Sequence, residues 1–218
     1  MIRHINKALV LVLIAFTSSC AVLAPETDRE LGALLDLLPG VYVGTAPVPG
    51  ATDGSTQTIY HKIAEIDASQ FGGRSFYYQL STGGPGGPPL QQKIFAFKTN
   101  PMRSGNYMRA WILSPGQEEP NLEQRPERWF YLEPSEFMSF PDKCAFRWER
   151  AGKGFEGVVS SDKCAFESKG FGQKIRPDMR YAVFADRFEW EETLRNTDGD
   201  VLVSTGGNLI AERQSGSL

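Results

Sequence analysis

The chain has 218 residues, of which 41% are apolar, with 23 Lys and Arg against 26 Asp and Glu. This length suits one domain with one substantial core. The mildly acidic balance argues against a nucleic-acid partner, because phosphate binding needs clustered basic side chains.

The first twenty residues, MIRHINKALVLVLIAFTSSC, have the layout of a secretory signal. Arg3 and Lys7 form a basic start, and the nine apolar residues that follow are too few to span a bilayer as a helix. The last four residues, Thr-Ser-Ser-Cys, resemble a bacterial lipobox. We therefore expect a signal peptide over residues 1–19 and a lipidated Cys20. A simply cleaved signal or a buried amphipathic start are the alternatives.

Lipidation would make the membrane a partner of the chain through Cys20. Ala21 follows, where an Asp would resemble an inner-membrane retention signal, so we expect an outer-membrane protein that faces the periplasm. Loss of Arg3 and Lys7 leaves 21 basic against 26 acidic residues, a formal charge of −5 for the remaining 199 residues.

One segment, Glu26–Leu38, has helical periodicity. Leu31, Leu34, Leu35 and Leu38 stand at i, i+3, i+4 and i+7, and a Pro-Gly pair then ends the helix. We divide the chain into a linker at 20–30, a barrel domain at 31–212 and a tail at 213–218.

After this helix the chain has the pattern of short strands separated by turns. Helices long enough for parallel crossovers are missing, so we expect a mainly β fold, an antiparallel meander closing into a barrel, with a two-sheet sandwich as the alternative. The expected strands are Val41–Val43, Gln57–Ile66, Ser75–Leu80, Gln92–Phe97, Tyr107–Leu113, Trp129–Leu132, Ala145–Glu149, Phe155–Val159, Tyr181–Phe184, Arg187–Leu194 and Val201–Val203.

Three segments are expected as loops: 47–56, 82–89 and 114–128. The second is an eight-residue segment in which seven Gly and Pro residues follow Thr82. Because it lacks G-K-[ST] and a following helix, it does not form a phosphate cradle.

The pentapeptide Asp-Lys-Cys-Ala-Phe occurs twice and contains Cys144 and Cys164. If Cys20 is lipidated, these two form an even pair in an oxidising compartment, which favours a disulfide. Two unpaired buried thiols, or a metal or redox site, are the alternatives. No Cys or His stands within four residues of either, and C-x-x-C is absent, so we expect no metal.

The stretch CAFRWERAGKGFEG from Cys144 to Gly157, with Cys164 beyond it, is similar to the "GC-x-x-x-W/F … G-x-F-x-G … C" hairpin of the T-type phycobilin lyases (CpcT/CpeT-like). Other pieces agree in the same order over residues 31–212. Leu37–Tyr42 resembles "L-x-G-x-Y/F", Phe76–Gln79 resembles "L-Y-V-E-Q", Pro89–Phe95 resembles "P-Y-R-Q-R-V-Y", and Phe130–Glu136 resembles the "L-T-P-E-E-L" step.

This resemblance implies a calycin-like antiparallel barrel, here in a lipoprotein. In the characterised lyases the barrel holds an open-chain tetrapyrrole and delivers it to a Cys of a phycobiliprotein. A bilin-like ligand is thus implied, and no other cofactor. Gln91 stands where the family has an Arg suited to a propionate. Whether the chain is an enzyme stays open. The alternatives are a non-catalytic envelope carrier of an apolar molecule and a structural or interaction lipoprotein, and a homodimer is possible.

No catalytic residue stands out, but several side chains are candidates for ligand contact. Tyr77, Tyr78 and Gln79 could line the barrel mouth or pack in its wall; Gln91, Gln92 and Lys93 could meet an acidic ligand group or form a solvated strand edge; Trp148 could stack on a planar ligand or pack in the core. His61 is expected as a core or strand-surface histidine. Glu189, Glu191 and Glu192 are expected on a solvated face.

Overall fold

The structure is a computed structural model that describes residues 26–48, 50–100, 103–113, 118–159, 162, 164–168 and 171–215. Residues 1–25, with the expected signal peptide and Cys20, lie outside this part. The helices are α2 (Glu26–Leu37) and α3 (Pro126–Trp129). The strands are β1 (Gly40–Pro47), β2 (Thr56–Ile66), β3 (Arg74–Thr82), β4 (Pro89–Asn100), β5 (Arg103–Leu113), β6 (Phe137–Ser139), β7 (Phe146–Ala151), β8 (Gly154–Val159), β9 (Phe166–Ser168), β10 (Gln173–Val183), β11 (Arg187–Asn196), β12 (Val201–Ser204) and β13 (Leu209–Arg213).

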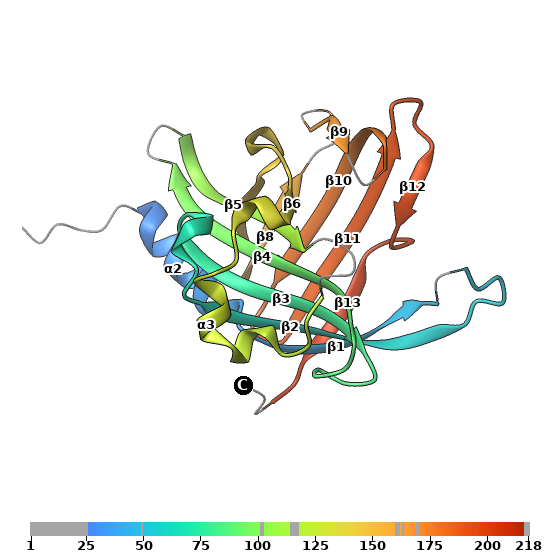
Figure 1. Cartoon of the computed structure of the whole chain (residues 1–218), viewed down its shortest axis with the longest axis horizontal. Coiled ribbons are helices and arrows are strands. Elements are labelled where there is room, and N and C mark those ends of the chain that lie inside the picture. Colours follow the sequence, from blue (N-terminus) through green and yellow to red (C-terminus); the bar gives the residue numbers. More distant parts are fainter. Residues whose placement is uncertain are drawn as a thin grey trace, which may run out of the picture.

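Ten antiparallel strands close into a barrel (Figure 1). Their order around the wall is β1-β2-β3-β4-β5-β7-β8-β10-β11-β13, and β13 pairs back onto β1. β6, β9 and β12 extend the wall as partners of β5, β10 and β11. The mainly β, calycin-like barrel with a short N-terminal helix is therefore confirmed, and the two-sheet sandwich is not the fold.

Helix α2 closes one end of the barrel. Its Leu34 and Leu35, and Leu38 just after it, are at most 1% exposed and join the cluster that fills the barrel interior. The Arg213 guanidinium donates hydrogen bonds to the carbonyls of Leu37 and Pro39, which holds the end of the helix against the last strand. In Figure 1 α2 lies at the left, opposite the end where the β1–β2 hairpin projects. We call the latter the open end.

Residues 118–137, here called the covering segment, lie over the outer face of β3, β4 and β5. They bury a second apolar cluster between themselves and the sheet, so that this part of the wall is packed on both faces. The Gln70 side-chain amide donates to the carbonyls of Trp129 and Leu132. The members of the cluster are Ala68, Phe71, Tyr77, Ile94, Ala96, Trp111, Leu113, Leu122, Trp129, Leu132 and Phe137.

The strand predicted at Trp129–Leu132 is wrong. Pro126 stands at the first turn of helix α3, where its fixed φ and missing N–H fit a helix start. The chain then turns, with the amides of Tyr131 and Leu132 donating to the Arg128 carbonyl. Trp129 and Leu132 are buried between the covering segment and the sheet, whereas Phe130 and Tyr131 are exposed. This stretch is thus apolar because it packs onto the outer face of the sheet, and not because it is a strand of that sheet.

The predicted disulfide is present. Cys144 and Cys164 are bonded with their Cα atoms 4.9 Å apart, and both are almost fully buried in the interior cluster. The β7–β8 hairpin lies between them, and in it Trp148 stands directly opposite Gly157. A Cβ on Gly157 would lie 2.4 Å from the indole ring, so the tryptophan at this position requires a glycine across from it. No helix in the described part of the chain is long and apolar enough to cross a bilayer.

Removal of the disulfide tests the hairpin closure. A Cys144→Ala/Cys164→Ala variant should lose about 3 kcal/mol of unfolding free energy, because the unfolded chain regains the entropy of an open loop of this length. Urea denaturation of both forms measures the loss. Peptide mapping without reductant should find the two cysteines linked in the unmodified protein, and finding free thiols there would contradict the pairing.

Candidate functional site

Strand alternation divides the predicted ligand-contact residues between two faces of the wall. Tyr78 and Lys93 are cross-strand partners that face the interior, and Trp148 also belongs to the interior cluster. Gln91 shares the face of Lys93 and lies nearer the open end, half-buried. The other three, Tyr77, Gln79 and Gln92, face outward beneath the covering segment. The seven residues therefore do not form one site.

The outward group fixes the covering segment to the wall. The Tyr77 hydroxyl donates to the side-chain carbonyl of Gln79 over 2.6 Å. The Gln92 amide pairs with the backbone of Glu119: its nitrogen donates to the Glu119 carbonyl, and its oxygen accepts from the Glu119 N–H at 2.9 Å. Since Gln92 is 1% exposed, the solvated-edge interpretation is wrong for it. These contacts hold the covering segment in place against the wall.

The interior group centres on an ion pair that crosses the barrel. Lys93 Nζ lies 2.8 Å from Glu192 Oε1 and donates to the Tyr181 hydroxyl at 2.8 Å, while that hydroxyl donates to the same Glu192 oxygen. β4 and β11 are five strands apart in either direction around the ten-stranded wall. The pair thus bridges opposite sides of the interior. The Lys93 side chain is 2% exposed, so the solvated-edge alternative is wrong here too.

Aromatic rings complete the surroundings of Lys93. Its ammonium lies 5.5 Å from the ring centres of both Tyr78 and Tyr181, within the range of a cation–π contact. Burial raises the pKa of both tyrosines well above the usual value, so they stay neutral. Burial also opposes ionisation of Glu192, but attraction to Lys93 and hydrogen bonds from Lys93 and Tyr181 outweigh it. The pKa of Glu192 is therefore lowered, and the pair is ionic.

His61 lies beside this cluster and is fully buried, which confirms the expectation of a core histidine. Its Nδ1 shares a hydrogen bond of 2.8 Å with the Tyr78 hydroxyl, and its ring meets Trp190 edge-on at 4.0 Å. Nε2 has no partner in the described part of the chain. Burial, reinforced by the Lys93 charge, lowers the pKa of His61 to about 3, so the ring is neutral at ordinary pH. This rules out a role as a general acid near neutrality.

Glu192 is the interior residue that the sequence analysis missed. The prediction of a solvated face is wrong for it, because its side chain is only 18% exposed. It is also wrong for Glu189, which is 7% exposed on the outer wall and paired with Arg180 and Arg187. A signal for Glu192 was available: alternation places it on the face of Phe188 and Trp190.

Between the ion pair and the open end lie four aliphatic side chains from different strands. They are partly buried and pack against the interior cluster: Leu80, Ile112, Leu194 and Leu209. Between the pair and the end closed by α2, aromatic rings fill the interior. Among them are Phe95, Phe146 and Phe188, each about 1% exposed or less. The arrangement offers an apolar rim with one charged floor.

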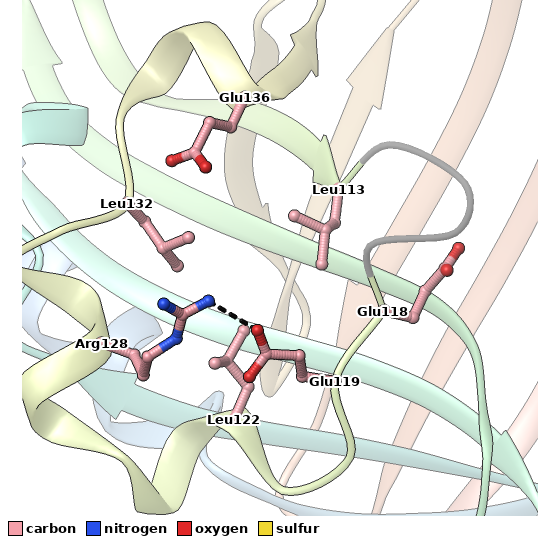
Figure 2. Close-up of a pocket in the computed structure, with 7 residues that line it drawn as sticks. All are labelled: Leu113, Glu118, Glu119, Leu122, Arg128, Leu132 and Glu136. Carbon is pink, nitrogen blue, oxygen red and sulfur yellow. Dashed lines mark hydrogen bonds and ion pairs between the residues drawn. The ribbon is translucent and has the colours of Figure 1, made fainter.

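The described residues form three cavities on the outside of the barrel. One, of about 270 Å³, separates the covering segment from β5 and is lined by Leu113, Glu118, Glu119, Leu122, Arg128, Leu132 and Glu136 (Figure 2). Figure 2 shows Arg128 turned toward Glu119, and Glu119 pairs with Arg125 as well. The others, of about 550 and 520 Å³, lie over β7–β8 and at the β2–β3 turn. Because Glu119 is already neutralised by two guanidinium groups, the first cavity holds no free charge from that residue.

No family model matches the chain, and no curated protein does. The solved structures that resemble it include the following two. The CRL protein of Arabidopsis aligns with a TM-score of 0.60 and 11% identity over 85% of this chain and 98% of its own. The T-type phycobiliprotein lyase CpeT from Prochlorococcus phage P-HM1 aligns with a TM-score of 0.46 and 12% identity over 84% and 97%. At these identities the CRL likeness shows a shared fold.

The neutral state of His61 predicts an acid-sensitive core. An unfolded histidine takes up a proton near pH 6.5, whereas the folded one does so only near pH 3. The unfolded state therefore binds more protons between these values, and stability should fall by about 2 kcal/mol from pH 7 to pH 5. Urea titrations across this range measure the slope. His61→Phe should flatten it, and an unmodified protein with no slope would contradict the prediction.

Proposed function

We propose that the chain is an envelope lipoprotein with a T-type-lyase-like barrel that binds a small elongated ligand at its open end. The observation that carries this is the ion pair between Lys93 and Glu192. A buried pair contributes little net stability, because desolvation of both charges offsets their attraction, and apolar residues of similar volume often serve as well. Its presence in an otherwise aromatic interior supports a role in recognition.

The place of the pair supports the open end as the binding region. Rings fill the barrel beneath it and α2 closes the far end, so a ligand would approach from the aliphatic rim. There it would contact the rim with its apolar surface and reach the charged floor with one polar group. Calycin-like barrels commonly take ligands in their mouths, by analogy of fold.

Binding without covalent attachment is the form of the proposal that the residues favour. Gln91 replaces the arginine that the T-type pattern has for a propionate, and the neutral His61 supplies no acid near pH 7. Bilin attachment, the activity that the T-type resemblance of the sequence implies, is the second candidate. It would require a bilin to form a stable complex here first.

The lipid anchor is the other half of the proposal and rests on the N-terminal sequence. Residues 1–20 have the three parts of a secretory signal and end in a lipobox-like Cys20. Intact mass spectrometry of protein from a bacterial envelope should show an N-terminus at Cys20 with added acyl mass. An N-terminus at another residue, or an unmodified Cys20, would overturn the anchor but not the binding proposal.

The binding proposal is tested with biliverdin and with an apolar fluorescent probe. Titration should quench the fluorescence of Trp190, which lies next to the polar cluster, and should shift the bilin absorbance. Ile112→Trp fills the rim and should weaken binding at least about tenfold. Val158→Trp is the matched control, because Val158 is exposed on the outer wall. Equal binding by both variants, or no quenching by either probe in the unmodified protein, would sink the proposal.

A further inference from the structure

The two oxygens of Glu192 are used unequally. Oε1 receives both hydrogen bonds, from the Lys93 ammonium and from the Tyr181 hydroxyl. Oε2 has no hydrogen-bond partner among the described residues, and the Glu192 side chain is 18% exposed. One carboxylate oxygen is therefore held in place, while the other accepts no hydrogen bond from the described residues.

Lys93 is in the opposite situation. Two of its three donors are used by Tyr181 and Glu192, and two tyrosine rings flank the ammonium. Its side chain is 2% exposed against 18% for Glu192. A ligand entering from the open end thus meets the carboxylate and not the ammonium.

We propose that the barrel selects an amphipathic ligand with a hydrogen-bond-donating nitrogen, an ammonium or N–H group, bound to Glu192 Oε2. This rests on the proposed function and names the ligand class of that site. A carboxylate accepts strong, charge-assisted hydrogen bonds from such groups. The aliphatic part of the ligand lies against Leu80, Ile112, Leu194 and Leu209, which supply apolar contact and no competing charge.

A ligand that inserts a carboxylate is disfavoured by the same geometry. It would face Glu192 Oε2, a like charge, and could reach Lys93 only by breaking the existing pair. This reverses the sequence-based expectation that Lys93 meets an acidic ligand group. The difference arises because Glu192, five strands away, already neutralises Lys93.

Ligands that differ only in the head group test the proposal. Dodecylammonium, dodecanamide and dodecanoate, each below its micelle concentration, are titrated at pH 7 and followed by calorimetry and Trp190 fluorescence. We expect both nitrogen heads to bind, with the ammonium at least about tenfold tighter than the carboxylate. Equal or tighter binding of dodecanoate overturns the inference while leaving the proposed function standing. No binding of any of the three, nor of the apolar probe above, overturns the proposed function itself.

Variants of the ion pair test whether Glu192 causes the preference for ammonium over carboxylate. Glu192→Gln should reduce the preference for ammonium over carboxylate about tenfold, whereas Glu191→Gln, its neighbour on the outer wall, should leave it unchanged. Because Glu192→Gln leaves Lys93 without its counter-charge and can unfold the chain, Lys93→Met/Glu192→Gln is the second variant. It removes both charges at similar volume, its folding is checked by circular dichroism, and it should bind the two charged probes alike. A preference for ammonium that survives in the folded double variant assigns the selectivity elsewhere and overturns the proposal.

Discussion

A charged side chain inside a barrel of aromatic residues needs a partner of opposite charge. Lys93 and Glu192 form such a pair, and they come from opposite sides of the barrel wall. A buried charge without its partner would lower the unfolding free energy by several kcal/mol. The positions of β4 and β11 in the wall are therefore constrained, because they must keep the two side chains in contact. Tyr181, on the strand next to β11, completes the hydrogen bonding and packs on Phe146. The pair therefore lies between the rings on the α2 side of the interior and the partly buried aliphatic side chains on the open-end side.

Most of the fold could be predicted from short-range patterns. Alternating β-branched and aromatic residues locate the main barrel strands, and the Gly/Pro run falls between β3, which ends at Thr82, and β4, which begins at Pro89. The strands β6 and β9 have three residues each, too few to show alternation, and β13 is also not predicted. Trp129–Leu132 misleads because a segment that docks on a sheet needs the same apolar residues as a strand.

The candidate site could be predicted only in part, because strand alternation gives the face of a residue but not which strands meet across a closed wall. Tyr78 and Lys93 could be placed together from their own hairpin, and Glu192 could be placed inward with Trp190. That Lys93 and Glu192 touch depends on the closure of ten strands, a property of the whole chain. For the same reason, the burial of Gln92 could not be foreseen: its partner, the backbone of Glu119, comes from a segment without a periodic pattern.

The helix that seals the barrel also fixes the direction from which the polypeptide arrives. Five residues lie between Cys20 and Glu26, the first residue of α2, a reach of about 20 Å at full extension. If Cys20 is held in a bilayer, as proposed, the sealed end must stay near the lipid, and the rim with Glu192 points toward the aqueous phase. Cargo would then be exchanged with soluble donors and acceptors and not drawn directly from the membrane on which the protein is tethered.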